Sequence, residues 1–586
     1  MTQISRKTAN DRVIPSVPQE LDDFEAAVRK FQAGEWDQTD FMAFRLRQGV
    51  YGQRQADAQM VRVKAPFGGL TADQLDILGE FADRYAPMRK GHVTTRENFQ
   101  FHHVLLSDAP DALRLLADGG LSTREACGNT VRNVTGCPMA GVCGVEEFDV
   151  TPYAAAYARY FVRHPFTQSL PRKIKTAFSG CAKDCAITPI HDIGFIPRVV
   201  DGEIGFRMVA GGGTSIMPRI APTLYEFVRM DEYLKVTEAC LRVFHSSNEL
   251  RRNRMKARIK FLIDRVGIDE FRKQVEEEME RPWAQRSFDP TDLLFIEDEA
   301  ADAPPLDGDY APAVPHPDFE RWVETNVADQ RQEGYTAATV KLPLGDIQAE
   351  QFGKLADMAR RYGGGRCRIT HQQNLTFRWV PRAALYELWL GLRSIGLADS
   401  GAHQIADVVA CPGTDSCKLG ITSSMGLGRA MREAIEGLDT RDPLVESMHV
   451  KISGCPNGCG QHHVADIGFH GAAAKAPGGQ VPAYELFLGG SYEADDPRFG
   501  IRARTKVPAK RAPEVLRSLI SLYLAERNEG EPFRDYAARV GKERFDEMLA
   551  DFKEVGELNR ETLASYMDWD KTIKYVLERG EGECMV

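Results

Sequence analysis

The sequence repeats itself, and this internal repeat constrains the fold more than any other feature. VTTRENFQFHHV at Val93 to Val104 aligns with ITHQQNLTFRWV at Ile369 to Val380, an offset of 276 residues. Upstream, VKAPFGG matches VKLPLGD at an offset of 277, and downstream SGCAKDC matches SGCPNGC at an offset of 274. Collinear matches at nearly one offset indicate that the chain consists of two related halves.

Each half follows the same order of predicted elements. An alternating apolar segment, Met60 to Ala65 or Thr339 to Leu344, predicts a strand, and a segment with helical spacing follows it. A second strand, Asn98 to Leu105 or Asn374 to Val380, completes a β-α-β unit. Strand and helix patterns then alternate through the cysteine region, which favours α/β or α+β. Phe288 to Pro317 is rich in Pro, Asp and Ala, as expected of an extended linker.

Composition limits the classes of protein. Of 586 residues 43% are hydrophobic and 27% charged, which is ordinary for a globular protein with a large core. The net charge of -10 leaves no overall basic footprint for nucleic acid. No run of eighteen apolar residues appears, and Met1 to Arg12 lacks an apolar secretory core. We therefore expect a soluble cytoplasmic protein that binds neither nucleic acid nor membrane.

Eight of the twelve cysteines form two sets, each a Cys-x5-Cys followed by a Cys-x3-Cys. The sets are Cys137, Cys143, Cys181 and Cys185 in the first half, and Cys411, Cys417, Cys455 and Cys459 in the second. Four thiolates from two loops suit an iron-sulfur cluster. Structural zinc usually takes Cys-x2-4-Cys pairs, so zinc is the weaker interpretation, and buried thiols without metal are a further alternative. The other four are interpreted as structural or surface thiols: Cys127, Cys240, Cys367 and Cys584.

The cysteine spacing with CPNGC, the TTRENFQFH segment and LPRKIK at Leu170 to Lys175 together resemble the sirohaem- and 4Fe-4S-dependent assimilatory sulfite and nitrite reductases. The resemblance runs from about Phe44 to the final helices and implies an α+β fold with a pseudo-twofold repeat. Two ferredoxin-like half-domains would form a central domain, flanked by two α/β domains that enclose a sirohaem and a 4Fe-4S cluster. The implied segments are an N-terminal extension (1–59), half-domain 1 (60–126), α/β domain 1 (127–287), the linker (288–317), half-domain 2 (318–405) and α/β domain 2 (406–586).

The resemblance also implies roles for individual residues. The cluster ligands would be Cys411, Cys417, Cys455 and Cys459, the last shared with the sirohaem iron. The cations around the oxyanion would be Arg62, Arg132, Lys173 and Lys175. The sirohaem contacts would include Arg96, Gln100, His102, Asn457 and Cys459. Many relatives lack a complete first-half set, so Cys137, Cys143, Cys181 and Cys185 are either a second cluster site or remnants.

The internal repeat allows the four predicted cations to be compared with the residues at the equivalent positions of the second half. The second half replaces them by Thr339 for Arg62, Ala406 for Arg132, Ser447 for Lys173 and His449 for Lys175. This asymmetry favours one working site over two, although any single cation is equally well explained as a solvated surface charge. Lys173 and Lys175, two apart on a strand, point to the same face. RRNRMKARIK at Arg251 to Lys260 is a candidate clamp for sirohaem carboxylates, or an exposed basic helix.

Lys-x-Lys in LPRKIK favours the six-electron reduction of sulfite to sulfide, since the nitrite enzymes of the family tend to have Lys-x-Asn. Nitrite reduction to ammonia is the alternative, and a non-catalytic iron-sulfur electron-transfer protein is a remote one that would not need the cations. GGGTS at Gly211 lacks the GxGxxG order of a dinucleotide site, so we expect a separate donor protein. FRLRQGVYGQRQ from Phe44 resembles the ferredoxin-dependent members, which makes ferredoxin the first candidate donor and a flavoprotein the second.

Overall fold

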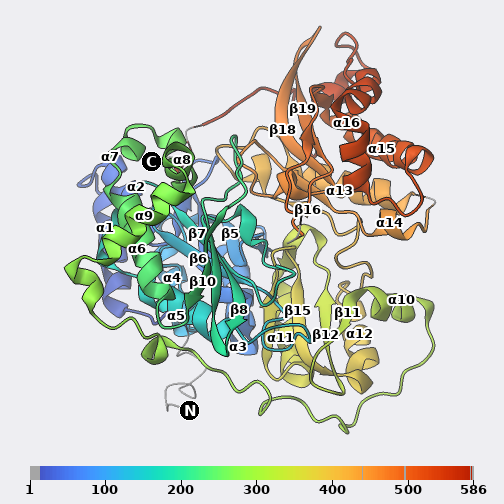
Figure 1. The fold of residues 1–586 in the computed structure, drawn as a ribbon. Helices are drawn as coiled ribbons and strands as arrows, with labels where there is room; N and C mark the ends of the chain where they lie inside the picture. Colours follow the sequence, from blue (N-terminus) through green and yellow to red (C-terminus); the bar gives the residue numbers. More distant parts are fainter. Residues whose placement is uncertain (1–12, 439, 494–495, 581, 584–586) are drawn as a thin grey trace.

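The computed structural model describes residues 13–438, 440–493, 496–580 and 582–583, and in these ranges the chain forms four β-sheets, two from each half (Figure 1). The repeat predicted from the sequence is therefore visible as two similar pairs of sheets. Cys584 lies outside the described residues.

The two central sheets are antiparallel and have the same strand order. The first contains β1 (Val50–Gly52), β2 (Ala58–Lys64), β5 (Asn98–Leu105) and β4 (Lys90–Val93). The second contains β11 (Val327–Asp329), β12 (Tyr335–Val340), β15 (Leu375–Pro381) and β14 (Arg366–Ile369). Each sheet takes its last strand from the other half, since β13 (Asp346–Gln348) pairs with β4 and β3 (Gly69–Thr71) pairs with β14. This exchange ties the halves into one central domain.

One predicted strand is displaced. The segment Thr339 to Leu344 was expected to be a strand, whereas β12 ends at Val340 and Pro343–Gly345 forms a 3-10 turn. Pro343 has no N–H for a sheet ladder, and Leu344 adopts a φ of 54°. The first half makes the same turn at Pro66–Gly68, directly after β2.

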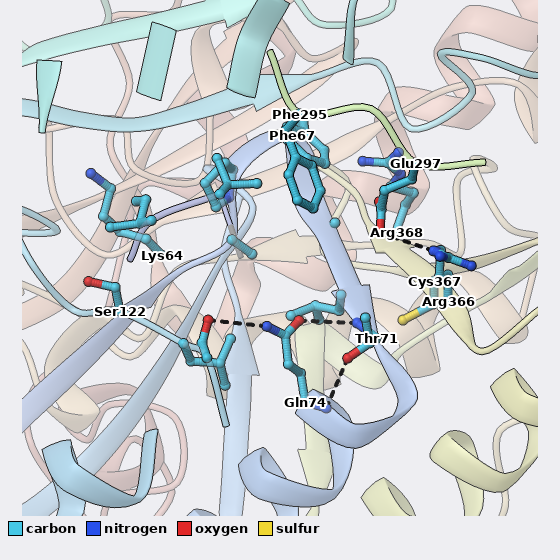
Figure 2. A pocket seen from close by; sticks show the side chains of 18 of the residues that line it. Lys64, Phe67, Thr71, Gln74, Ser122, Phe295, Glu297, Arg366, Cys367 and Arg368 are labelled. Atoms are coloured by element: carbon cyan, nitrogen blue, oxygen red, sulfur yellow. Dashed lines mark hydrogen bonds and ion pairs between the residues drawn. The ribbon is translucent and has the colours of Figure 1, made fainter. Parts of the chain in front are cut away.

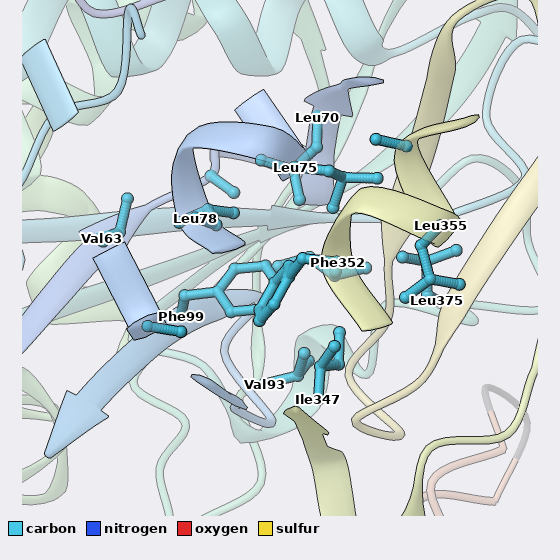
Figure 3. Packing of buried hydrophobic residues seen from close by; sticks show 14 of the residues in the cluster. Val63, Leu70, Leu75, Leu78, Val93, Phe99, Ile347, Phe352, Leu355 and Leu375 are labelled. Carbon is cyan, nitrogen blue, oxygen red and sulfur yellow. The ribbon is translucent and has the colours of Figure 1, made fainter. Parts of the chain in front are cut away.

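Helices α3 (Ala72–Tyr85) and α11 (Ala349–Tyr362) pack together over the two central sheets, and each begins with a capping box. Their apolar faces belong to one hydrophobic core that contains residues of both halves, among them Phe99 and Phe352 (Figure 3). The helices approach closely at Gly79, where a Cβ atom would lie 2.7 Å from the Cβ of Phe352. The remaining helices of the central domain are α1 (Pro18–Gln32), α2 (Gln38–Arg47), α4 (Ala109–Asp118), α10 (Pro317–Asn326) and α12 (Leu385–Ser394).

The two flanking domains contain mixed sheets that begin with parallel strands. The first domain has β6 (Val131–Gly136), β7 (Ile174–Phe178), β8 (Ile193–Val200), β9 (Glu203–Ala210) and β10 (Thr223–Arg229). Its helices are α5 (Thr151–Phe161), α6 (Tyr233–Ser246), α7 (Asn248–Arg252), α8 (Ile259–Val266) and α9 (Ile268–Met279). The second has β16 (Val409–Ala410), β17 (Val450–Ser453), β18 (Ile467–Ala476), β19 (Gly479–Leu488), β20 (Ile501–Arg502) and β21 (Val507–Pro508), with α13 (Ser424–Glu436), α14 (Pro443–Glu446), α15 (Ala512–Glu526) and α16 (Phe533–Leu549). In both, the cysteine loops follow the first two strands.

The linker is extended, as its composition predicts. In this fully described stretch, no helix or strand lies between Leu293 and Pro317. Figure 1 shows it running around the central domain before it reaches α10.

Candidate active site

A cavity of about 360 Å³ lies between the first half and the second flanking domain. Its lining residues come from regions far apart in the sequence. The first half contributes Arg62 on β2, Gln100 and His102 on β5, Lys173 directly before β7 and Lys175 within it, so that only the second of these lysines lies on the strand expected for both. The second half contributes Asn457 and all four of its paired cysteines, Cys411, Cys417, Cys455 and Cys459.

A smaller cavity of about 140 Å³ shares residues with the first one, including Arg62, Lys175 and Cys459, and adds Arg96 and Arg132. Every residue predicted for the working site therefore lines one of these two adjoining cavities. The first-half cysteines line neither. The structure thus brings first-half cations and second-half cysteines together, as the asymmetry of the repeat suggests.

The second-half cysteines lie on two loops in close backbone contact. A Cβ on Gly454 would lie 2.6 Å from the Cα of Gly413, so only glycine lets these loops approach. The N–H of Gly454 donates to the Cys411 Sγ at 3.2 Å. Burial, followed by the charges of neighbouring cysteines, raises the pKa of Cys411 and of Cys455. Positive metal ions would offset both effects, so these loops suit thiolate ligands.

The four thiols of the second-half set line one cavity. A structural zinc ion needs its four ligands around one point, whereas a 4Fe-4S cluster attaches each thiolate to a different iron. Four thiols on two loops beside one cavity suit such a cluster.

Backbone carbonyls hold the two predicted arginine cations in place. Arg132 donates to the carbonyl of Gly128 at 2.6 and 2.9 Å and to that of Ala126 at 2.8 Å. Arg62 donates to the same Ala126 carbonyl at 3.2 Å. With its amide turned to accept, Gln100 places Oε1 2.6 Å from Arg62 Nη2. Guanidinium groups keep their charge when buried, so these residues form a fixed cationic wall.

The backbone of Lys175 and the side chain of Arg258 share a buried carboxylate. The backbone N–H of Lys175 donates to Asp192 Oδ2 at 2.8 Å, and Arg258 Nε donates to Asp192 Oδ1 at 2.7 Å. Burial, with the charges of Arg258, Lys173 and Arg96, holds the pKa of Lys175 well below the usual lysine value. A lysine with a lowered pKa gives up its proton more readily, so Lys175 suits proton donation.

Arg96 and His102, two of the expected cofactor contacts, differ in how many of their hydrogen-bonding atoms have partners within the protein. Arg96 donates to the carbonyls of Asn133 at 2.6 Å and Thr176 at 3.2 Å, and burial lowers its pKa to about 10. His102 has one partner, Gln53 Oε1, 3.1 Å from its Nδ1. Its Nε2 is buried without a protein partner among the described residues. His102 is therefore the better placed of the two to hydrogen bond with a bound group.

The basic segment at Arg251 to Lys260 is not an ordinary exposed helix. Five of its residues line the larger cavity: Met255 and the basic residues Arg254, Lys256, Arg258 and Lys260. Among the described residues, Arg258 Nη2 is a second buried atom without a protein partner. Burial lowers the pKa of Lys260 to about 7, and its Nζ donates to the Thr214 carbonyl at 2.9 Å. The segment therefore presents donors to the cavity, as a carboxylate clamp would.

Several residues that line the larger cavity were not predicted from the sequence. Arg172 lies inside LPRKIK, and Thr214 and Ser215 belong to GGGTS, which was considered only as a nucleotide loop. The sequence indicates these residues only through their closeness to residues already predicted for the site or considered as a nucleotide loop. Of the cysteines outside the two sets, Cys240 and Cys367 are buried, and Cys127 is buried with its Sγ 3.4 Å from Arg62 Nη1.

The comparisons with known proteins agree with this geometry. The model of the nitrite and sulphite reductase 4Fe-4S domain matches residues 127–283 and 401–555. The model of the nitrite/sulfite reductase ferredoxin-like half domain matches residues 51–119 and 328–395. The chain belongs to the nitrite and sulphite reductase family. It is therefore an oxidoreductase, and the predicted family and fold are confirmed.

Relatives in this family carry both substrate names. A ferredoxin–nitrite reductase of Synechococcus elongatus is 32% identical over 79% of this chain and 85% of its own length. A sulfite reductase [ferredoxin] of Mycobacterium tuberculosis is 30% identical over 82% of each chain. The structure of the Mycobacterium tuberculosis NirA protein matches with a TM-score of 0.75 and 28% identity, over 92% of this chain and 97% of that one.

The cofactors of this nitrite and sulphite reductase family protein are sirohaem and a 4Fe-4S cluster, and the cavities fit both. Four thiols lie on one wall for the cluster. The unpartnered His102 Nε2 and Arg258 Nη2, with the surrounding lysines and arginines, suit a tetrapyrrole that carries many carboxylates.

No helix in the described part of the chain is long and apolar enough to cross a membrane.

Proposed function

We propose that this protein is an assimilatory sulfite reductase, which reduces sulfite to sulfide with six electrons. The observation that carries the proposal is the meeting of first-half cations and second-half cysteines around two adjoining cavities. When bound, sirohaem and the cluster supply the iron that holds the anion and the electrons that reduce it. A protein that only transferred electrons would have no use for this cationic wall.

The cysteines and the cations have separate tasks in this proposal. The cluster would be held by Cys411, Cys417, Cys455 and Cys459, and Cys459 would also serve as a ligand of the sirohaem iron. Arg62 and Arg132, fixed by backbone carbonyls, hold the oxyanion through charge-assisted hydrogen bonds. Lys173 and Lys175 bind the anion and donate protons as its oxygens leave as water.

A second group of residues holds the tetrapyrrole. We assign Arg96, Gln100, His102 and Asn457 to this group. Arg258 and its neighbours in the basic segment clamp the carboxylates, because within the part of the chain that the structure describes Arg258 Nη2 and His102 Nε2 have no protein partners. Loss of these contacts would weaken sirohaem retention before it changed the chemistry at the anion.

Nitrite reduction is the second candidate, since two relatives at 32% and 30% identity are named nitrite reductases. The deciding experiment measures kcat/KM for sulfite and for nitrite with one chemical reductant. We expect sulfite to be preferred at least about tenfold, and Lys175→Asn to move the preference toward nitrite. A higher kcat/KM for nitrite in the wild type would assign the chain to nitrite instead.

The proposed electron donor is ferredoxin, with a flavoprotein as the second candidate. Relatives of both substrate names are described as ferredoxin enzymes. Reduced ferredoxin should sustain turnover, whereas NADPH with a flavoprotein reductase should not. The opposite result would replace ferredoxin by the flavoprotein.

A further inference from the structure

The linker between the halves covers a second basic surface, which is separate from the proposed active site. Figure 2 shows Phe295 and Glu297 of the linker beside Phe67, Arg366 and Arg368 of the central domain. Arg366 Nε lies 3.1 Å from Glu297 Oε1. Only about 40 Å³ of free space remains under this part of the linker. The linker thus packs onto the central domain at this point.

The next acidic residue of the linker, Glu299, enters the basic surface more deeply. Its Oε1 forms ion pairs with Arg368, at 3.2 Å, and with Arg378, while Trp379 Nε1 donates to its Oε2 at 2.8 Å. Both arginine side chains are 5% exposed, and Glu299 is 14% exposed. Burial alone would raise the pKa of Glu299, but the two guanidinium charges and the indole N–H outweigh it and lower the pKa to about 2.

The first half has the same framework without a linker carboxylate. His103 N–H donates to Gln53 Oε1 at 2.9 Å, and its counterpart, Trp379 N–H, donates to Gln330 Oε1 at 3.1 Å. The first-half counterparts of the basic residues line an open cavity of about 290 Å³: Lys90, His92, His102 and His103. Arg368, Arg378 and Trp379 line a cavity of about 210 Å³ that the linker residues 295–300 help to enclose. Both copies of the framework hold a carboxylate: Asp346 of β13 lies 2.6 Å from Lys90 Nζ and 2.9 Å from His92 Nδ1 in the first half, and Glu299 of the linker takes this place in the second half.

We propose that Arg368, Arg378 and Trp379 form a carboxylate-binding pocket that the chain occupies with its own Glu299. Three N–H donors from β14 and β15 meet the two oxygens of one carboxylate, an arrangement that matches its planar shape. Arg378 Nη1 also donates to the Ala140 carbonyl at 2.5 Å, in the first-half cysteine loop. The linker is therefore a strap, bound through Glu299, that joins the second half of the central domain to that loop.

The pocket accepts a short free carboxylate once Glu299 is truncated. Glu299→Ala removes the carboxylate and its Cγ methylene group and leaves two buried guanidiniums without an anion. Acetate restores the same atoms. A buried charge that loses its partner is strongly destabilising, so we expect the apparent Tm of the holoenzyme to fall by about 2–4 °C.

The test is a thermal unfolding series of the holoenzyme with sodium acetate, acetamide or sodium chloride at matched concentration. Acetate should raise the Tm of Glu299→Ala well above any shift in the wild type, and the other two additives should not. Asp307→Ala, at an exposed position of the same linker, should show neither the loss nor the rescue. Equal acetate shifts in Glu299→Ala and wild type would overturn the proposal.

Glu299→Gln keeps the shape of the side chain and tests the charge alone. Its Tm at neutral pH should lie below that of the wild type, because an amide cannot neutralise two guanidiniums. The folded pKa of about 2 lies below the ordinary 4.5, so the carboxylate stabilises fully above about pH 4.5 and less as the pH falls toward 2. The difference between the two proteins should shrink over that window. A Glu299→Gln protein as stable as the wild type at neutral pH would refute the pocket, even if Glu299→Ala failed to fold.

Discussion

The two cysteine sets share one spacing and differ in what they face. Second-half thiols line a cavity of about 360 Å³ whose other walls carry lysines and arginines. Three of the first-half thiols interact with one another instead, since Cys185 shares hydrogen bonds with Cys137 and with Cys181. The bond with Cys137 is the main cause that raises the pKa of Cys185 to about 12. The two sets therefore have different surroundings although their spacing is the same.

The difference teaches that ligand spacing alone does not make a site. Each cysteine loop meets the central domain, but the second-half loop meets an open cavity and the first-half loop meets Arg378, which donates to the carbonyls of Pro138 and Ala140. Arg378 is held in turn by Glu299 of the linker. We therefore propose that Cys137, Cys143, Cys181 and Cys185 are remnants without a cluster.

The largest effect should come from serine at one position of each set. Cys459→Ser should abolish turnover and the sirohaem spectrum, because in the proposed site Cys459 would be the thiolate that the two cofactors share. Cys185→Ser, its counterpart in the first half, should keep both. Iron analysis of anaerobically purified protein should give about five irons per chain in the wild type and in Cys185→Ser, four from one cluster and one from sirohaem.

The proposed difference between the two cysteine sets would be refuted if the first-half set held a cluster. About nine irons in the wild type, with four lost on Cys185→Ser, would mean a second cluster. Zinc, or iron without sirohaem, would refute the proposed active site in the second half as well.

A smaller effect is expected from the cationic wall. Lys175→Ala should lower kcat/KM for sulfite by about 10²–10³-fold, since it removes one charged donor to the reacting anion. His449→Ala, at the equivalent second-half position, should leave turnover close to the wild-type value. The sirohaem spectrum of both variants should be unchanged, so that loss of activity reports the anion site. Equal losses in the two variants would mean that the halves contribute equally.

The smallest effect concerns the packing of the two central helices. Gly79→Ala should lower the free energy of unfolding by about 1–3 kcal/mol, because its Cβ would meet that of Phe352 at 2.7 Å. Gly353→Ala, in α11, has no atom nearer than Asp76 Oδ1 at 3.9 Å, so it should gain about 0.5–1 kcal/mol from helix propensity. Urea unfolding of both variants measures the difference. A gain in stability from Gly79→Ala would contradict the close helix contact.

Much of the candidate site was predictable because cysteines and cationic residues can be recognised as candidate ligands and anion-binding groups from the sequence alone. The cysteine pairs, the four cations and the asymmetry between the halves are visible without coordinates. Thr214 and Arg172 were not found, because a residue that supplies only shape or one more charge carries no pattern of its own. The strand expected at Thr339 to Leu344 was misplaced, since its alternating apolar pattern continues into a turn that begins at Pro343.

The sequence by itself determined that the chain is a duplicated α+β protein with thiol-rich loops and one set of cations. Only the tertiary structure decided which loops face those cations, because this depends on the exchange of β3 and β13 and on the packing of α3 against α11. It also decided that Glu299 occupies the pocket between Arg368 and Arg378. The local sequence pattern indicates which secondary structure and which chemistry a segment can provide. A cavity or an ion pair, in contrast, requires residues far apart in the sequence to meet.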